Sequence, residues 1–417
     1  MKSYEIARER YAGLGTDTGI AIEKLAAIPI SLHCWQTDDV GGFEINPGNP
    51  GGGLAVTGNF PGKARNMREV RADLEKAMSL IPGKLRVNLH ASYGDFSQKP
   101  ADRDQIEPLH FASWVHWAKE HKAGLDFNST FFAHPKADSG FTLSNTDKGV
   151  RDFWIEHSRR CREIAAYLGR ELGNTCVHNV WIPDGSKDET LNRLLHRQIL
   201  EDSLDKIFEK EIDPSLMVDA VESKLFGIGS ESFVVGSFEF YFGYAITRKK
   251  MLCLDMGHFH PTESVADKVS AVLLYLDRIL FHFSRGIRWA SDHVLTFNDP
   301  IRDLALELVR SGALDRSALA LDFFDASINR IGAYVIGTRA AQKALLFALL
   351  EPTETLRQLE KEGRFFERLA LLEELKSMPL GDIWNHYCEL QNVLPAEKWI
   401  DEVRRYEKEE LIIRKTF

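Results

Sequence analysis

The sequence is poor in cysteine and has no basic surplus. Its five cysteines are scattered along 417 residues, and no Cys-x-x-Cys pair occurs. Disulfide frameworks and structural zinc sites need clustered cysteines, so we expect a reduced, cytoplasmic protein. The 52 Lys and Arg are outnumbered by 61 Asp and Glu, which gives a net charge of −9. An acidic chain argues against a nucleic-acid partner, because the phosphate backbone attracts a basic face.

Long apolar runs and the common nucleotide and hydrolase motifs are also missing. The longest aliphatic run, Ala344 to Leu350, is far shorter than the ~20 residues that cross a bilayer, so we expect no membrane partner. The first ten residues lack the apolar core of a signal peptide. No G-x-S-x-G motif, Walker A loop or complete dinucleotide fingerprint is present, so a serine hydrolase and a nucleotide enzyme have no support.

What the sequence does contain is a regular alternation of short apolar stretches and longer amphipathic segments. The strand candidates are 28–34, 85–90, 124–128, 176–182, 217–222, 251–255, 279–283 and 317–322. Helical periodicity marks the segments between them, among them 66–80, 108–122, 147–172, 190–211, 264–276 and 298–311. Strands that alternate with helices indicate a parallel sheet, and eight such units predict an α/β fold of the (β/α)8 TIM-barrel type.

Helical sequence also precedes the first predicted strand and follows the last one. We expect residues 1–330 to form the catalytic barrel with an N-terminal helical cap, and residues 331–417 to form a C-terminal helical arm. The arm either contacts another subunit or only covers one wall of the barrel, and we favour the subunit contact.

Polar or aromatic residues lie at the end of nearly every predicted strand. They are His33, His90, Asn128, Trp181 or Asp184, Glu222, Asp255, His282 and Asp322. The carboxyl ends of barrel strands carry the active site, so we expect these side chains to converge. Strand alternation supports this, because it places Ala318, Ala320 and Asp322 on one face and the leucines between them on the other.

Four of these residues supply three carboxylates and one imidazole: Glu222, Asp255, His282 and Asp322. A mixed oxygen and nitrogen set favours Mn²⁺, Mg²⁺, Co²⁺ or Zn²⁺ over a thiolate site, and we expect no cysteine in it. His258 and Asp292 add a further imidazole and carboxylate, so two divalent ions in one cleft are the natural hypothesis. Lys224, two residues after Glu222, either contacts a substrate oxygen or forms a salt bridge with Glu222.

Seven runs, in order along essentially the whole chain, resemble the L-rhamnose isomerase family of the xylose-isomerase-like barrels. They are 31–36 with the aspartates at 38 and 39, 61–64, 125–128, 181–185, 219–227, 257–263 and 321–330. The resemblance implies a homotetramer that interconverts L-rhamnose and L-rhamnulose by a metal-assisted hydride shift between C1 and C2. It also implies activity on rare sugars such as D-allose and D-allulose.

The resemblance further implies two divalent ions per subunit, usually Mn²⁺. Glu222, Asp255, His282 and Asp322 match the ligands of the structural ion, and His258 and Asp292 match ligands of the catalytic ion. The residues expected to line the sugar are Trp35, His90, Phe127 and Trp181. We expect Asp322, Lys224 and His258 to act in catalysis.

The chain departs from the family pattern at the catalytic ion. Where the family has Trp-Asp-Ser-Asp-His, this chain has Trp289-Ala290-Ser291-Asp292-His293. Ala290 offers no ligand atom, so we expect weaker metal binding there and slower turnover. Two alternatives stay open: a non-catalytic sugar-binding protein, because of Ala290, and a metal-dependent endonuclease or hydrolase on the same type of barrel.

Overall fold

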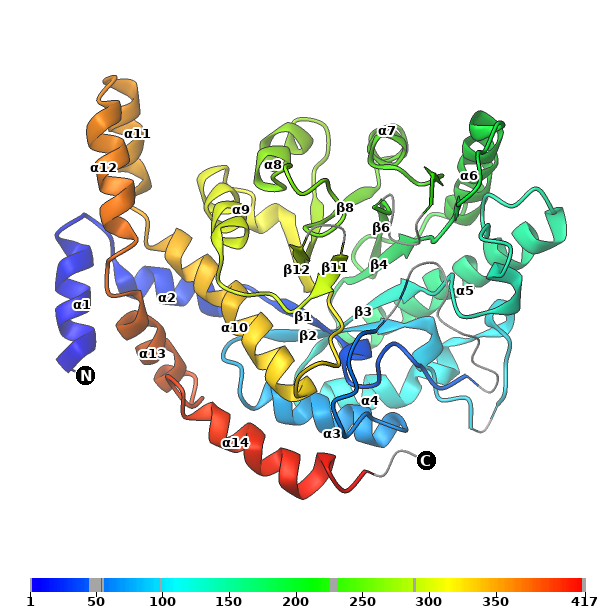
Figure 1. The fold of residues 1–417 in the computed structure, drawn as a ribbon, viewed down its shortest axis with the longest axis horizontal. Coiled ribbons are helices and arrows are strands. Elements are labelled where there is room, and N and C mark those ends of the chain that lie inside the picture. The colour runs from blue at the N-terminus through cyan, green and yellow to red at the C-terminus, as the bar shows by residue number, and fades with distance from the viewer. Residues whose placement is uncertain are drawn as a thin grey trace.

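We describe the protein from a computed structural model, and Figure 1 shows its fold. The described residues are 2–44, 54, 56–97, 99–225, 231–287 and 290–414, and residues 290–292 are described by their backbone alone. Within these ranges, no helix has both the length and the apolar character needed to cross a membrane.

Eight parallel strands close into a barrel at the centre of the molecule (Figure 1). They are β1 (Ile30–His33), β2 (Leu85–His90), β3 (Gly124–Ser129), β4 (Cys176–Trp181), β6 (Met217–Glu222), β8 (Met251–Asp255), β9 (Ile279–Phe283) and β12 (Ser317–Leu321). Each pairs with the next barrel strand along the chain, and β12 returns to β1. The predicted (β/α)8 barrel is therefore confirmed, and the predicted strand ends differ from the observed ones by no more than two residues.

A ring of helices surrounds the strands. Its members are α3 (Met67–Met78), α4 (Ala112–His121), α5 (Lys148–Leu172), α6 (Arg193–Phe208), α7 (Phe238–Arg248), α8 (Ala266–Leu273), α9 (Asp299–Arg310) and α10 (Arg330–Leu349). Local sequence sets their ends. At α5, for example, the Asp147 side chain accepts hydrogen bonds from the backbone N–H groups of Gly149 and Val150, and Gly173 ends the helix at a φ of 64°.

Further helices lie outside the ring. They are α1 (Lys2–Ala12), α2 (Thr18–Ala27), α11 (Thr353–Lys361), α12 (Phe365–Leu375), α13 (Leu380–Leu390) and α14 (Trp399–Tyr406). The loops also form two short antiparallel sheets of two strands each. In one, β5 (Gly185–Ser186) pairs with β7 (Phe233–Val234), and in the other, β10 (Arg285–Ile287) pairs with β11 (Ala290–His293).

Helix α10, which the sequence assigned to the arm, packs as a member of the barrel ring. It lies against α9, α2 and α3, and most of its side chains are buried. The chain that extends beyond the ring therefore begins after α10. In Figure 1, α11 and α12 project from the body at the upper left. Helices α13 and α14 run below α10 along the lower edge of the molecule. The domain boundary and a subunit contact of the arm stay predictions.

The seam between the first and last strands is held by side chains as well as by the sheet. The β1–β12 register pairs Ser31 with Ala320. Just beyond it, the Gln36 side chain donates to the carbonyl of Asp325 at 2.9 Å and accepts from its N–H at 2.8 Å. Arg330 then forms a two-pronged ion pair with Asp39, with both N···O distances 2.8 Å. The carboxyl ends of β1 and β12 are thus fixed to one another.

On the side of β4, β6, β8, β9 and β12, the interior of the barrel contains a small apolar cluster. Its buried members are Val177, Ala220, Met251, Cys253, Leu280 and Ala320. Leu252, Leu254 and Leu321 alternate with them and pack outward with the main core. This apolar layer forms the floor beneath the polar residues at the carboxyl ends of the strands.

Candidate active site

Three carboxylates and an imidazole meet at the carboxyl ends of β6, β8, β9 and β12. Glu222, Asp255, His282 and Asp322 each offer one ligand atom, and these atoms all lie within 4.8 Å of one another. Nδ1 of His282 is central: it lies 3.3 Å from Oε1 of Glu222, 3.2 Å from Oδ2 of Asp322 and 3.8 Å from Oδ2 of Asp255. The convergence expected for these four residues is observed.

Strand register explains why the four groups meet. Asp255 and His282 are direct Cα partners across β8 and β9, and His282 is the partner of Ala320 across β9 and β12. Asp322 follows Ala320 by two residues, so strand alternation returns it to the inner face. Backbone and hydroxyl donors then fix Asp255, because the N–H of Gly257 and the hydroxyl of Ser284 donate to its Oδ1 at 2.6 and 2.7 Å.

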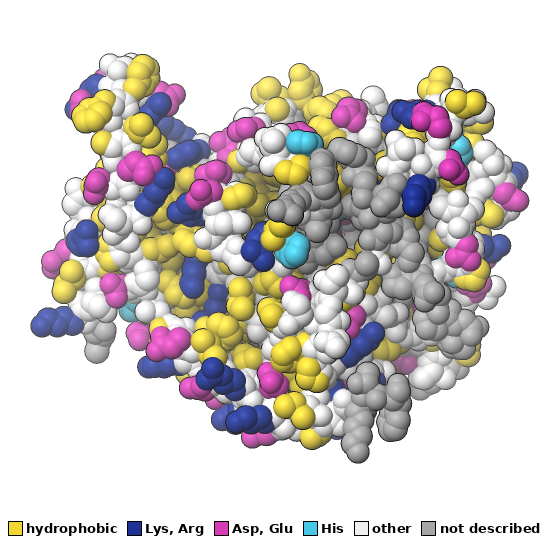
Figure 2. Space-filling model, in the orientation of Figure 1, with side chains coloured by type: hydrophobic (Ala, Val, Ile, Leu, Met, Phe, Trp, Pro, Cys, Tyr) yellow, Lys and Arg dark blue, Asp and Glu magenta, His cyan; other side chains and the backbone are white. Residues whose placement is uncertain are grey.

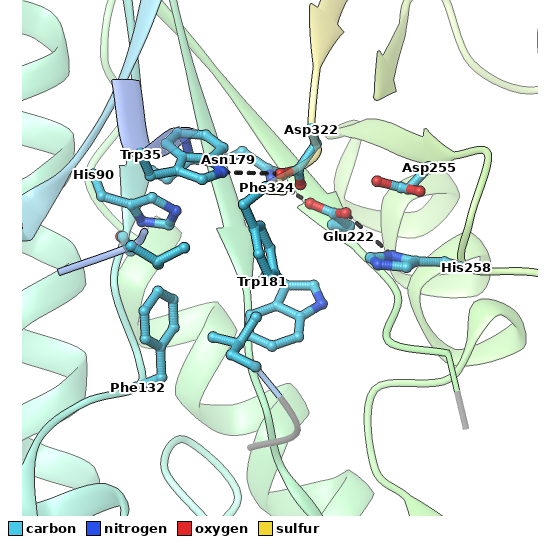
Figure 3. A pocket seen from close by; sticks show the side chains of 14 residues that line it. Trp35, His90, Phe132, Asn179, Trp181, Glu222, Asp255, His258, Asp322 and Phe324 are labelled. Atoms are coloured by element: carbon cyan, nitrogen blue, oxygen red, sulfur yellow. Dashed lines mark hydrogen bonds and ion pairs between the residues drawn. The ribbon is translucent and has the colours of Figure 1, made fainter. Parts of the chain in front are cut away.

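His258 joins the cluster from the turn that follows β8. Its Nδ1 lies 3.2 Å from Oε1 of Glu222, and Figure 3 shows its ring facing that carboxylate. Its own N–H closes the turn by donating to the carbonyl of Asp255 at 3.2 Å. A metal-ligand role for His258 is therefore geometrically accessible, as the sequence suggested.

Burial and the contacts between carboxylates and imidazoles perturb the pKa values of the cluster. Burial raises the pKa of Asp255 to about 7. Burial would lower the pKa of His258, but the carboxylates of Asp255 and Glu222 outweigh it and raise that pKa to about 9. The pKa of Glu222 lies below its ordinary value, because His282 and His258 outweigh the effect of burial. Protons on the imidazoles thus balance the carboxylates at neutral pH, and a divalent cation would compete for the same lone pairs.

The donor atoms fit such a cation. Oε1 of Glu222, Nδ1 of His258 and both ring nitrogens of His282 are buried and have no hydrogen-bond partner among the described residues. Buried polar atoms normally form hydrogen bonds, whereas these atoms make only the ion-pair contacts given above, so their concentration in one place indicates a ligand. Carboxylate oxygens with imidazole nitrogens suit Mn²⁺, Mg²⁺, Co²⁺ or Zn²⁺.

A cavity opens beside the cluster. Glu222, Asp255, His258 and Asp322 line one side of it. The opposite wall is mostly aromatic and consists of Trp35, His90, Phe132, Trp181 and Phe324 (Figure 3). Val40 and Leu54 also line the cavity. The cavity therefore offers one face that fixes polar groups and one that contacts carbon and hydrogen.

Hydrogen bonds tie the two walls together. Nε1 of Trp35 donates to Oδ1 of Asp322 at 3.2 Å, and the amide of Asn179 donates to Oε2 of Glu222 at 2.5 Å. The rings of Trp35 and His90 make an edge contact with their centroids 4.4 Å apart. The expected positions of Trp35, His90 and Trp181 at the cavity are observed.

The structure corrects two expected positions. Phe127 does not line the cavity: its ring packs against Phe111 at a centroid distance of 4.9 Å, because Asn128 beside it on β3 faces inward. Lys224 also lies away from the cavity lining. Its Nζ donates to the carbonyl of Pro183 at 2.8 Å and pairs with Glu231, so the expected salt bridge with Glu222 is replaced by another.

Asp184 has a different role from the one expected, and two side chains at the second ion site are not described. Asp184, the alternative to Trp181 at the end of β4, is buried and accepts hydrogen bonds from the backbone and hydroxyls of Thr142 and Ser144. It therefore anchors a loop. The side chains of Ala290 and Asp292 lie outside the described residues, so the second ion site stays a prediction.

Sequence reasoning missed three kinds of residue. Phe132 and Phe324 lie in loops, where no periodicity marks their direction. Asn179 precedes Trp181 by two residues on β4 and could have been found by alternation. Cys253 was also left out of the expected set, and its sulfur lies within 4.8 Å of ligand atoms of Glu222 and His282.

A closed parallel barrel with carboxylates and imidazoles gathered at its carboxyl face defines a class, the metal-dependent α/β-barrel enzymes. Within that class, residues 1–414 match the family model described as L-rhamnose isomerase (RhaA). The chain is 54% identical over 410 residues to an L-rhamnose isomerase of Rhodopirellula baltica, covering 98% of this chain and 96% of the relative. It is 55% identical over 409 residues to one of Bacteroides thetaiotaomicron, covering 98% and 97%. The chain belongs to the L-rhamnose isomerase family.

Solved structures with a similar fold are more distant. A D-allulose 3-epimerase from Methylomonas sp. matches with a TM-score of 0.45 at 12% identity, covering 77% of this chain and 97% of that one.

Proposed function

We propose that the protein is an intramolecular aldose–ketose isomerase that interconverts L-rhamnose and L-rhamnulose. The observation that carries the proposal is the cluster of Glu222, Asp255, His282 and Asp322 beside an aromatic wall, in a chain of this family. The cavity then has a polar side for vicinal hydroxyls and an apolar side for the remainder of a 6-deoxy sugar. D-allose and D-allulose are proposed as further substrates.

The reaction moves a hydrogen from C2 to C1 as hydride, and a proton passes between the oxygens on the same two carbons. A divalent cation held by Glu222, Asp255, His282 and Asp322 would supply the charge that fixes neighbouring sugar oxygens and polarises the carbonyl. The protein's own part is positioning. Trp35 and Asn179 hold the carboxylates of Asp322 and Glu222 in one orientation, and reacting atoms held in one geometry react faster.

The aromatic wall has a second role in this proposal. Trp35, Phe132 and Trp181 cover the face of the sugar opposite the carboxylates and exclude water from the two reacting carbons. Val40 and Leu54 offer aliphatic contacts that suit the C6 methyl group. His90, whose Nδ1 lies 3.0 Å from Oγ1 of Thr130, is proposed to bind a distal hydroxyl through its other ring nitrogen.

We propose two ions per subunit, with Mn²⁺ as the native metal and Co²⁺, Mg²⁺ or Zn²⁺ as alternatives. His258 and Asp292 are the proposed ligands of the second ion. Ala290 removes one expected carboxylate from that site, so the second ion is bound more weakly and turnover is reduced. Asp322 and His258 keep their proposed place in the catalytic machinery, whereas the contacts of Lys224 support an anchoring role for the loop that holds Glu231.

Incubation with L-rhamnose and Mn²⁺ tests the proposal, with L-rhamnulose detected by chromatography. The matched sample is the Ala290→Asp variant, which separates a weak enzyme from a non-catalytic sugar-binding protein. Product from either protein supports the isomerase. If neither protein makes L-rhamnulose while both bind the sugar, the sugar-binding alternative replaces it.

We also propose a cytoplasmic homotetramer in which the projecting helices contact another subunit. The outer face of α12 carries Phe365, Phe366 and Leu369, and Phe366 is 84% exposed. Figure 2 shows hydrophobic side chains on these projecting helices. Large apolar side chains that stand together in solvent are typical of protein interfaces.

A further inference from the structure

Cys253 lies one layer below the carboxylates, inside the barrel. Strand β8 alternates, so Cys253 points to the same side as Asp255. Glu222 is its direct Cα partner across β6 and β8. The sulfur, an oxygen of Glu222 and a nitrogen of His282 all lie within 4.8 Å of one another, and the thiol is fully buried.

The other two members of this group carry unused donor atoms. Oε1 of Glu222 and both ring nitrogens of His282 are buried and form no hydrogen bond within the described residues, although Nδ1 of His282 lies 3.3 Å from Oε1 of Glu222 and 3.2 Å from Oδ2 of Asp322. Glu222 is 2% exposed and His282 1% exposed, so bulk water does not satisfy them. Nε2 of His282 has neither a hydrogen bond nor an ion-pair contact within the described residues, and this buried nitrogen beside the sulfur is the sign of a ligand. A buried cysteine alone is more often a small apolar core residue.

The apolar floor around Cys253 mixes small and large side chains. It contains Ala220 and Ala320, together with Leu280, which is the direct Cα partner of Cys253 across β8 and β9. By contrast, Cys176 belongs to the outer core cluster, where its sulfur contacts the carbonyl of Val177 at 3.8 Å. Cys176 is therefore a matched control: a second fully buried cysteine on a barrel strand, but outside the candidate ligand groups.

We propose that Glu222, Cys253 and His282 form a second, sulfur-containing coordination set that takes a thiophilic divalent ion such as Cd²⁺ or Zn²⁺. Thiolate ligands select such ions, whereas carboxylates select harder ones. When the ion binds, the Cys253 thiol loses its proton to solvent and a sulfur–metal bond forms, with no change of oxidation state. Water fills the remaining position of a tetrahedral site.

The sulfur-containing set shares Glu222 and His282 with the metal centre of the proposed function, and the inference rests on that centre to this extent. One ion can use the shared ligands at a time. A thiophilic ion in the lower set therefore excludes Mn²⁺ from the upper one, and Cd²⁺ acts as a competitive inhibitor of Mn²⁺ loading. The sulfur thus makes the position of the bound ion depend on whether that ion prefers sulfur or oxygen ligands.

Titration of the metal-free, full-length protein with Cd²⁺ tests the proposal. We expect a thiolate-to-cadmium charge-transfer band in the near-ultraviolet difference spectrum, saturating at one equivalent per chain. Cys253→Ala and Cys253→Ser are expected to lose the band, and Cys176→Ala to keep it. Mn²⁺ affinity, from the paramagnetic resonance signal of free Mn²⁺, is expected to change less than about twofold in Cys253→Ala, since Mn²⁺ prefers oxygen ligands.

Cadmium NMR of the unmodified protein gives the same answer without a variant, because sulfur ligation shifts the cadmium resonance strongly. Absence of the band and of this shift, in protein that binds Mn²⁺, would overturn the sulfur set and leave the proposed metal centre intact. A band that persists in both Cys253 variants also overturns it. If the protein binds neither Cd²⁺ nor Mn²⁺, the metal centre of the proposed function fails together with this inference.

Discussion

The side-chain amide of Asn179 donates to Oε2 of Glu222 at 2.5 Å, which leaves Oε1 of Glu222 facing the imidazoles of His258 and His282. One hydrogen bond thus decides which carboxylate oxygen is presented to a cation. Partners that orient metal ligands are typically worth 10–100-fold in metal affinity.

Replacement of this donor should weaken metal binding without unfolding the barrel. We expect Asn179→Leu, which is similar in size but donates nothing, to raise the dissociation constant for Mn²⁺ by about tenfold. Asn128→Leu is the control, because Asn128 is the strand partner of Asn179 but donates to Asn88 at 2.6 Å. Titration with Mn²⁺, followed by the resonance signal of the free ion, measures both. Equal losses in the two variants would contradict a specific role for Asn179.

Restoring a carboxylate at position 290 should raise activity. Ala290→Asp supplies the missing ligand of the proposed second ion, so we expect kcat on L-rhamnose to rise by more than about tenfold. Adding Asp292→Asn to this variant should remove the gain, because both carboxylates serve the same ion. An Ala290→Asp variant with unchanged kcat and unchanged Mn²⁺ stoichiometry would show that position 290 does not serve a metal.

Metal binding should release protons. The pKa of His258 is raised to about 9 and that of Asp255 to about 7, and a cation takes the deprotonated forms. Affinity for Mn²⁺ should therefore fall as pH falls from 9 to 7, by up to about tenfold per pH unit, and more steeply below 7. Calorimetry in buffers of different ionisation enthalpy counts the protons released. A Mn²⁺ affinity that is constant from pH 9 to pH 6 would contradict the charge balance described for the cluster.

His33 should make the fold sensitive to acid. Burial lowers its pKa from 6.5 to about 3, and neither ring nitrogen has a hydrogen-bond partner among the described residues. Between pH 3 and pH 6.5, His33 is protonated in the unfolded chain but not in the folded protein. The free energy of unfolding therefore has its full value above pH 6.5 and decreases as the pH falls below it. One pH unit below 6.5 the loss from this residue is about 1.4 kcal/mol.

The variant His33→Phe removes this titration and keeps the ring contacts with Phe323 and Trp35. We expect the variant to lose less unfolding free energy than the unmodified protein when the pH is lowered from 7.5 to 5.5. Urea unfolding of both proteins without metal, followed by tryptophan fluorescence, gives the comparison. Identical pH slopes would rule out a neutral His33 as a source of acid sensitivity.

The exposed face of α12 should control assembly. Phe366→Glu places a charge where an apolar contact is proposed, so we expect it to shift the protein from the proposed tetramer toward smaller species. Leu109→Glu is the control, because Leu109 is 65% exposed on a different surface. Sedimentation at several protein concentrations distinguishes the outcomes. A Phe366→Glu protein that sediments like the unmodified one would place the interface elsewhere.

The barrel and its carboxylate cluster could be predicted from sequence because both depend on a period of two residues. In β8, for example, the apolar residues Leu252 and Leu254 fix the outward face, so Asp255 has to point inward. The same rule applied to β3 would have turned Phe127 outward, since Asn128 faces the interior. That error came from the family resemblance, which names residues near a site without stating their direction.

The remaining errors arise where the periodicity stops. Lys224 was expected on the face of Glu222, but β6 ends at Glu222 and the backbone N–H of Lys224 turns to donate to Gly236. Helix α10 is buried on most of its circumference, and such a helix has no apolar stripe that distinguishes a barrel helix from an arm. Phe132 and Phe324 depend on loop conformation, which no local pattern specifies.

Because the barrel closes between β1 and β12, the four ligands can come together only late in synthesis. Asp322 comes from the last strand, whereas its indole partner Trp35 follows the first. During synthesis, the ligands from β6, β8 and β9 leave the ribosome well before Asp322 does. A nascent chain therefore cannot complete the cluster until the barrel closes around its final strand. Binding of a cation by all four proposed ligands would therefore mark the point at which the last barrel strand has joined the first.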